Sequence, residues 1–394
     1  MFNYSESCAR LLLESGFDTY YAFETARDML LNRRPTIINI LTSADLSQLA
    51  RLFPGVAFRK HYLEHAFVES NGQSVHFYVS DILSKDTRKA SNRTEIRGGA
   101  LKRAASYTPF LINGFFYDIE EEIFHDPLDA YSILKSKIIK ANQPLEIIGE
   151  TFPHLALKTA KVYCETGFSI DTALYNFIRE KASRKIYEKM NEAVVQDFIK
   201  ILLTGRASRA MGMLDEWGIL EAILPEITAL KEVDQDKDHH PEGNGFWHTL
   251  HCLRFVKKPN KNLMTALLLH DTGKAVTKEN GKSSLPFPDH SHASTIVARR
   301  VLRRFCYPKE DIEEVVFLIK NHMILNAIDI LPEKRINELF SSPYFPNLLE
   351  LYRADLESGY HGIESYYHAA RRYREFLKKE KLLRNGHYLS KRCT

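Results

Sequence analysis

Five short stretches in the second half of the chain place histidine or aspartate beside aliphatic residues at helical spacing. In "LLLHDTGKAVT" an apolar run ends in His270 and Asp271. Four further stretches, "GFWHTLHCLRFV", "FPDHSHAS", "LIKNHMIL" and "LYRADLES", contribute His248, His290, His322 and Asp355. A polar group that is buried without a partner costs several kcal/mol, and one divalent cation can satisfy many such groups together. The residue types and spacing therefore predict a buried metal centre.

We predict the following metal ligands: His248, His270, Asp271 and Asp355. Imidazole and carboxylate groups without thiolates suit manganese, iron, cobalt, nickel or magnesium as well as zinc, bound as one ion or two. Such a centre acidifies a bound water and holds a phosphoryl oxygen. His290, His322 and Lys274 are then candidate catalytic residues, which would neutralise growing charge or hold a second ion.

The adjacent His270-Asp271 pair also has a simpler interpretation. Neighbouring residues on a helix point about 100° apart, so one ion binds both most easily where the helix ends. Gly273 is expected to supply that end. Without a metal, the same letters describe an ordinary helix C-terminus, in which Lys274 lies near the negative end of the helix dipole.

These residues belong to a helical region, which follows a mixed N-terminal region. The segments 36–44 and 74–82 are short and rich in β-branched residues, and they predict strands. The segments 110–118 and 122–127 predict two more strands joined by an acidic turn. After Pro153 apolar residues recur at three- and four-residue spacing, and the polar stretch 231–245 is the expected linker. We predict an α+β head (1–145), an all-α neck (146–232) and an all-α C-terminal domain (233–394).

The composition is that of a globular protein. The 394 residues are 44% hydrophobic and 26% charged, with a net charge of +4 that does not by itself indicate a nucleic-acid binder. The basic excess lies in 361–394, a tail that either faces phosphates or, as we favour, forms a solvated helix. Five scattered cysteines, the lack of a long apolar run and the lack of a signal peptide predict a cytoplasmic protein with no membrane partner.

The set His248, His270-Asp271 and Asp355 resembles the H…HD…D pattern of HD-domain metal phosphohydrolases. In that family these four residues hold a metal, and the enzymes hydrolyse phosphate esters of nucleotides and RNA. Histidines similar in position to His290 and His322 bind a second metal or contact the phosphate. The resemblance implies a nucleotide or RNA phosphoester as the substrate.

A wider resemblance covers nearly the whole chain. "HHPEGNGFWHTL" is similar to the segment that begins the HD domain of bacterial CCA-adding tRNA nucleotidyltransferases. "ARDMLLNRRPTIINILTSA", "TPFLINGFFYD" and "TAKVYCETGFSIDTAL" are similar to segments of the same family's head and neck. The resemblance implies a nucleotidyltransferase-like head, an RNA-binding neck, an HD domain and tRNA as a further partner.

The head departs from that family where its chemistry is expected. Nucleotidyl transfer needs two carboxylates two residues apart on a strand, so that both face the same metal ions. This chain has Ile37 and Asn39 at those positions, and Phe23-Glu24 in place of a glycine pair. These differences predict an inactive head.

We therefore predict a metal-dependent phosphohydrolase that acts from its HD domain on a nucleotide or an RNA end and carries an inactive head. One alternative is a tRNA-binding protein without turnover. The other is residual CCA-adding activity.

Overall fold

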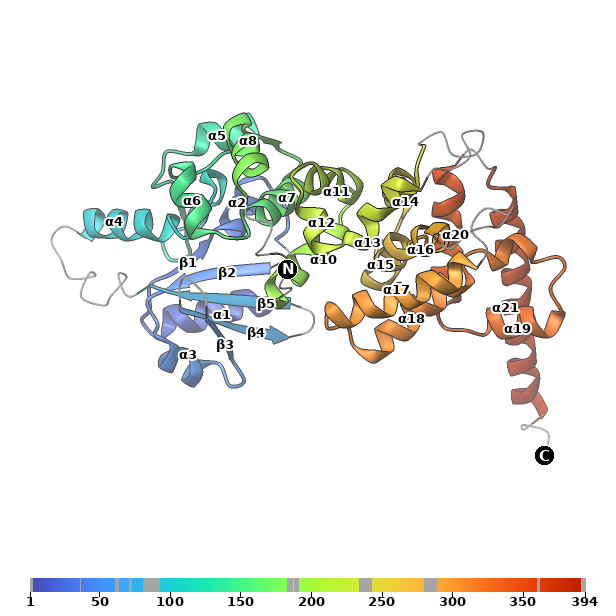
Figure 1. Ribbon diagram of the computed structural model, residues 1–394. Coiled ribbons are helices and arrows are strands. Elements are labelled where there is room, and N and C mark those ends of the chain that lie inside the picture. Colours follow the sequence, from blue (N-terminus) through green and yellow to red (C-terminus); the bar gives the residue numbers. More distant parts are fainter. Residues whose placement is uncertain are drawn as a thin grey trace. The chain divides into compact units, whose positions relative to one another are not determined.

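The computed structural model describes residues 3–35, 37–60, 64–70, 73–80, 93–182, 187, 191–233, 243–279, 289–359 and 362–390. The chain forms two compact units (Figure 1). The first comprises residues 1–155 and 168–177, and the second comprises residues 156–167 and 178–394.

A mixed sheet organises the first unit. Its strand order is β3-β4-β5-β2-β1-β6-β7, and β2 pairs with β5 in parallel while the other neighbours are antiparallel. The strands are β1 (Thr19–Ala22), β2 (Ile37–Thr42), β3 (Ala57–Lys60), β4 (Glu64–Ser70), β5 (Gln73–Val79), β6 (Phe116–Asp118) and β7 (Ile123–His125). A separate parallel pair joins β8 (Ile138–Ile139) to β9 (Ser169–Ile170).

Helices pack on both faces of this sheet because successive side chains of a strand point to opposite faces. Ile38 and Ile40 of β2 belong to a core cluster that also contains residues of α1 (Asn3–Glu14) and α3 (Leu46–Leu52). Leu41 belongs to a second cluster, with residues of α4 (Arg93–Ala105). The remaining helices of this unit are α2 (Glu24–Leu30), α5 (Tyr131–Ser136) and α6 (Leu145–Thr151).

The predicted strands correspond to only part of this sheet. The segment 36–44 contains β2, 74–82 contains all of β5 except Gln73, and 122–127 contains β7. The prediction of one strand over 110–118 is wrong for its first half, where Leu111–Asn113 forms the 3-10 helix η2. Asn113 is turned inward there, where its side chain binds Arg27 and Glu24. Three strands (β1, β3 and β4) were not predicted.

The second unit is helical, and its described residues contain no strand. Its helices begin with α7 (Leu155–Thr166), α8 (Thr172–Lys181), which starts in the first unit, α10 (Glu192–Leu202), α11 (Ala207–Glu216), α12 (Ile219–Ile223) and α13 (Pro225–Thr228). They continue with α14 (Gly245–Phe255), α15 (Lys261–Leu269), α16 (Gly273–Glu279), α17 (His290–Arg304), α18 (Lys309–Asn321), α19 (Glu333–Phe340), α20 (Phe345–Ser358) and α21 (Glu364–Ser390). The fold class is as predicted: a mixed-sheet head followed by helices.

Asparagine side chains begin two of the helices that matter for the site. Asn244 accepts a hydrogen bond from the Trp247 backbone at α14, and Asn260 accepts one from Leu263 at α15. Each satisfies one of the backbone donors that a helix N-terminus leaves unpaired, a contribution of about 1 kcal/mol. No described helix is long and apolar enough to cross a membrane.

A bidentate ion pair joins two helices of the second unit. Glu226 on α13 accepts hydrogen bonds of 2.9 Å from both terminal nitrogens of Arg304 on α17. Burial alone would raise the pKa of the Glu226 carboxyl, but Arg304 lowers it below its usual value of 4.5. Because the folded-state pKa is the lower one, the pair stabilises the fold above pH 4.5 and loses this effect as the pH falls further.

We expect Glu226→Gln to lower the free energy of unfolding at pH 7 by about 1–3 kcal/mol, because the charge-assisted bonds to Arg304 are lost. The difference from the wild type should shrink as the pH falls below 4.5, where the wild-type carboxyl takes up a proton. Urea unfolding of both proteins at pH 7 and below pH 4.5 measures this difference. Glu313→Gln, which removes an exposed pair with Lys309, is the control and should change little. Equal losses for the two variants would contradict the prediction.

Candidate metal centre

Six predicted side chains from five parts of the second unit converge in its interior. Residues of the first group are His248 on α14, His270 after α15, and Asp355 on α20. In this group the potential ligand atoms lie within 4.8 Å of one another. His248 Nε2 is 3.0 Å from Asp355 Oδ1, and His270 Nε2 is 3.8 Å from the same oxygen. The first group therefore combines two imidazoles and a carboxylate around one position.

The second group consists of Asp271, His290 at the start of α17, and His322 after α18. Asp271 Oδ1 is 3.5 Å from His290 Nε2 and 3.8 Å from His322 Nε2. The Nε2 atoms of the two histidines are 3.4 Å apart. These three side chains define a second position where a cation would find nitrogen and oxygen ligands together.

Asp271 lies between the two groups. Its Oδ2 atom is 3.4 Å from His270 Nε2 and 3.9 Å from His248 Nε2, whereas its Oδ1 atom faces His290 and His322. One carboxylate thus offers one oxygen to each group. This arrangement can serve one ion or two.

His270 and His322 take the same local conformation for the same reason. Each follows the last residue of a helix, where backbone carbonyls lack intrahelical partners. The Nδ1–H group of each ring donates to the carbonyl three residues earlier, Leu267 or Ile319, at 2.7 Å. With Nδ1 protonated, the Nε2 lone pair of each ring faces the cluster, as a metal-binding histidine requires.

The ring of His248 is held by a neighbour on α20. Ser358 Oγ lies 3.2 Å from His248 Nδ1, and it donates a hydrogen bond to the Asp355 backbone carbonyl at 2.7 Å. Ser358 therefore ties α14 to α20 at the point where His248 Nε2 meets Asp355.

The electrostatics of the cluster suit a divalent cation. Burial lowers the pKa of His322 to about 4, so its ring is neutral at pH 7. Burial alone would raise the pKa of Asp271, yet His270 and Lys274 hold it well below its usual value. Within the described chain, His270 Nε2 is buried and has no hydrogen-bond partner. The neutral His322 ring, the ionised carboxylates and this orphaned nitrogen fit a bound metal ion.

Lys274 lies in a different environment from the one predicted. Its Nζ atom is 2.6 Å from Asp271 Oδ2, and the side chain is largely buried. In the structure this cation neutralises the carboxylate that lies between the two groups. Its predicted contact with a substrate phosphate stays a prediction.

Gly273 does not end a helix as predicted. Helix α15 ends at Leu269, and Gly273 begins α16 without a positive φ angle. Its role is steric, because a Cβ atom there would lie 2.2 Å from His290 O and 2.5 Å from Ser294 N. The missing side chain lets the start of α17, which carries His290, approach the Asp271 segment.

Cys252 was not predicted as part of this cluster. It is buried on α14, with Sγ 3.7 Å from His248 Nε2, and it donates to Ser358 Oγ at 3.2 Å. Burial raises the pKa of its thiol. In the sequence it has no paired cysteine that would indicate a thiolate site. The four-residue spacing from His248 nevertheless places both side chains on one helix face.

The head places one carboxylate beside two amide side chains. Glu24, the first residue of α2, accepts hydrogen bonds from Asn39 Nδ2 at 2.9 Å and from Asn113 Nδ2 at 3.2 Å. Asn113 Oδ1 in turn accepts one from the buried Arg27 at 2.9 Å. A carboxylate therefore lies directly beside the strand position where the sequence comparison found only an amide. Ile37 and Asn39 themselves supply no carboxylate pair, so they do not fit a two-metal site on β2.

A second acidic group of the head has its own counterion. Asp118, Glu121 and His125 place potential ligand atoms within 4.8 Å of one another. However, Arg97 Nη1 is 2.8 Å from the Glu121 carboxylate and 3.4 Å from that of Asp118. Asp118 also accepts backbone hydrogen bonds from Glu120 and Glu121 at 3.0 Å, so it is buried rather than part of a solvated turn. Arg97 thus supplies this group with a counterion.

Comparison with known proteins divides the helical region into two family matches. Residues 167–231 match the probable RNA- and SrmB-binding site of polymerase A, and residues 247–355 match the HD domain. The second match begins one residue before His248 and ends at Asp355, so it spans the whole cluster.

The relatives and a solved structure agree on the architecture. The chain is 31% identical over 182 residues to the multifunctional CCA protein of Halorhodospira halophila, covering 45% of this chain and 43% of that protein. It is 31% identical over 201 residues to the CC-adding tRNA nucleotidyltransferase of Thermus thermophilus, covering 48% and 44%. The Bacillus stearothermophilus CCA-adding enzyme in complex with CTP has the same fold, with a TM-score of 0.61 at 16% identity over 94% of this chain and 82% of that one. This chain has the architecture of the CCA-adding and poly(A) polymerase family, with an HD domain.

The matches span less than half the length of these two curated relatives. They nevertheless overturn the main functional prediction. The prediction of a phosphohydrolase with an inactive head is wrong, because the relatives and the structural neighbour are CCA-adding or CC-adding proteins. Glu24, at the start of α2, places a carboxylate beside the Asn39 position from a different element.

Proposed function

We propose that this protein binds the 3′ end of tRNA and adds nucleotides to it. The observation that carries the proposal is the family architecture, since the relatives in it are named for CCA or CC addition. The segment 167–231, which matches a probable RNA-binding site of polymerase A, supports RNA as the partner.

Within the head, Glu24 is the side chain proposed to take the acidic role. It is half-buried and held in place by the amides of Asn39 and Asn113. Arg27 and Asp28 lie on the same helix, where Arg27 Nε donates to Asp28 Oδ1 at 2.8 Å. A buried guanidinium can hold a phosphate oxygen, and a fixed carboxylate can accept the proton of the attacking hydroxyl.

The histidine cluster is proposed to hold a divalent metal. His248, His270, Asp271 and Asp355 form the first position, and Asp271 with His290 and His322 forms the second. When bound, such an ion supplies a fixed positive charge that can hold a phosphate oxygen of a nucleotide or RNA. The donor set accepts Mn, Fe, Co, Ni, Mg or Zn.

The test of nucleotide addition is the incorporation of labelled CTP or ATP into tRNA that lacks its 3′-terminal nucleotides. Wild-type protein should incorporate label, and Glu24→Gln should incorporate about 100-fold less, because the carboxylate charge beside Asn39 is lost. Glu120→Gln, on the exposed turn after β6, is the matched control and should keep wild-type activity. Equal incorporation by both variants would remove Glu24 from the proposal.

A second candidate is tRNA binding without transfer, and the apolar Ile37 on β2 favours it. Wild-type protein that shifts tRNA in a gel without incorporating label would support this candidate and contradict nucleotide addition. A salt-sensitive shift that survives His270→Ala would also separate RNA binding from the metal cluster.

A further inference from the structure

A cavity of about 510 Å³ opens between α11 and α14 of the second unit, and its lining contains no residue of the histidine cluster. Arg209 on α11 and Arg206, the residue before that helix, line one side. Trp247, His251 and Arg254 line the other side from α14. Its volume is in the range of pockets that hold a nucleotide-sized ligand. Helix α11 lies in the RNA-binding match and α14 in the HD match, so neither family match contains the whole cavity.

The cavity is basic. Three arginines line it against one acidic side chain, Glu216. Arg206 is anchored, because its Nη1 donates to the Cys164 carbonyl at 3.0 Å. Arg209 and Arg254 are exposed, and among the described residues neither forms an ion pair. Their guanidinium groups are available to an anion that enters the cavity.

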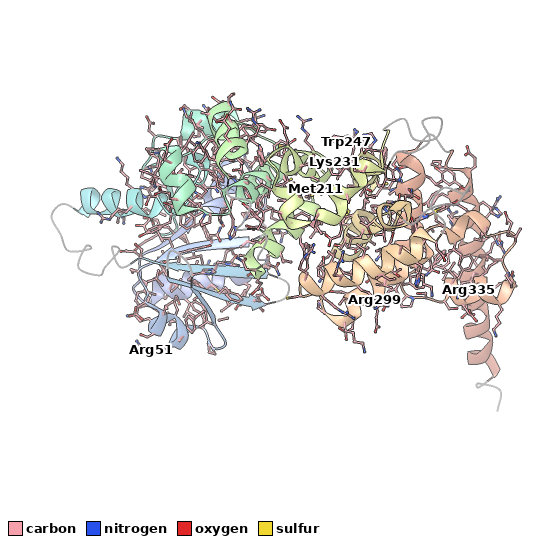
Figure 2. The ribbon with its side chains drawn as sticks, viewed as in Figure 1. Arg51, Met211, Lys231, Trp247, Arg299 and Arg335 are labelled. Carbon is pink, nitrogen blue, oxygen red and sulfur yellow. The ribbon has the colours of Figure 1, made fainter. Side chains whose placement is uncertain are left out.

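An exposed indole stands beside these charges. Trp247 is 46% exposed, although large aromatic side chains are usually buried. It projects from the first turn of α14 (Figure 2), and its ring lies against Gly212 of α11, where a Cβ atom would be 4.0 Å from Cζ3. The ring also contacts Phe246 edge to face. An aromatic face beside free guanidinium groups is the combination that binds the bases and phosphates of single-stranded RNA.

We propose that this cavity binds one or two nucleotides of single-stranded RNA, with a base stacked on Trp247 and phosphates held by Arg209 and Arg254. The inference rests on the proposed function, in that RNA is the partner. It adds a binding position outside both the head and the metal cluster. The basic lining and the aromatic face together favour RNA over a peptide.

Tryptophan fluorescence tests the proposal directly, because the chain has only two tryptophans and Trp217 is 1% exposed. Titration of the full chain with an eight-nucleotide oligoribonucleotide should therefore quench the emission of Trp247. Trp247→Leu should weaken binding of this RNA about 5- to 100-fold, the loss expected for one base stack. Trp247→Phe should retain most of the affinity, which controls for misfolding.

The arginines are tested by salt dependence. Arg209→Gln and Arg254→Gln should each reduce the slope of log affinity against log salt by about 0.7, the value for one phosphate contact on a single strand. Arg299→Gln on α17 is the matched control for these two variants, and Tyr367→Leu on α21 is the matched control for Trp247→Leu. Both side chains are exposed, and neither lines the cavity. Unchanged slopes for the two cavity variants would overturn the phosphate assignment.

Incorporation of labelled CTP into tRNA, measured in parallel, separates this inference from the proposed function. RNA binding that depends on Trp247 in a protein that adds no nucleotide would support the cavity and contradict nucleotide addition. Nucleotide addition and RNA affinity that are both unchanged in Trp247→Leu would overturn the cavity proposal alone.

Discussion

Asp271→Asn is expected to empty the histidine cluster of divalent metal, with a fall from one or two ions per chain to less than a tenth of that amount. The reason is the central place of this carboxylate. Its Oδ2 atom lies 3.4 Å from His270 Nε2, and its Oδ1 atom lies 3.5 Å from His290 Nε2. Asparagine keeps the shape but loses the charge and replaces one acceptor oxygen with a donor, so one position loses its oxygen ligand and the other keeps only a neutral one.

Metal content by mass spectrometry of the purified protein measures this effect without an activity assay. Asp329→Asn is the matched control. Asp329 also pairs with a histidine, His368, at 2.7 Å, but its side chain is 70% exposed. Full metal content in Asp271→Asn, or equal losses in the two variants, would show that the cluster is not the metal site.

The same substitution should also destabilise the metal-free protein. Lys274 is largely buried, and its hydrogen bond to Asp271 Oδ2 is 2.6 Å long. Removing one partner of a buried ion pair costs about 3–5 kcal/mol because the remaining charge is left uncompensated. Thermal unfolding after chelation should therefore show a lower midpoint for Asp271→Asn than for the wild type. An unchanged midpoint would mean that Lys274 finds another acceptor.

Gly273→Ala is expected to have the second large effect, through the backbone rather than through charge. The added methyl group would lie 2.2 Å from His290 O and 2.5 Å from Ser294 N, and both are backbone atoms that cannot rotate away. Helix α17 must move to make room, and it would carry His290 away from Asp271. We expect a loss of about 3 kcal/mol in stability, at the upper end of the usual range for overpacked sites, together with reduced metal content.

Gly98→Ala provides the matched control for this prediction. Gly98 lies within α4, and a Cβ atom there would meet nothing within 4 Å. Alanine is the better helix former by about 0.5–1 kcal/mol, so this variant should be slightly more stable than the wild type. Urea unfolding of both variants measures the contrast. Equal changes in stability for Gly98→Ala and Gly273→Ala would contradict the steric explanation for Gly273.

The helical part of the fold and the members of the cluster could be predicted because both depend on local patterns. Apolar residues at helical spacing place His248 and Asp355 on inward faces. The apolar run before His270 indicates a buried helix, and α15 forms there, although it ends at Leu269 and not at Gly273 as predicted. The strands β1, β3 and β4 were missed because short strands take their register from distant partners and carry little periodicity of their own.

Other features of the site could not be read from spacing. The contact of Glu24 with Asn39 joins the start of a helix to a strand, and the role of Gly273 depends on the approach of α17. The cavity beside Trp247 likewise exists only because α11 packs on α14. The head was predicted to be inactive for this reason, since the sequence shows the substitutions at Ile37 and Asn39 but not the groups that the fold brings beside them.

The sequence by itself determined the residue types at the cluster and the helices that carry them, because amphipathic spacing is a property of each segment alone. Only the tertiary structure decided that the two oxygens of Asp271 face different histidines, that Ser358 lies beside Cys252, and that Glu24 lies beside Asn39. Each of these depends on distances of a few ångströms, and most of them join residues far apart in the chain. Such distances are set by how whole helices and strands pack, which no local pattern encodes.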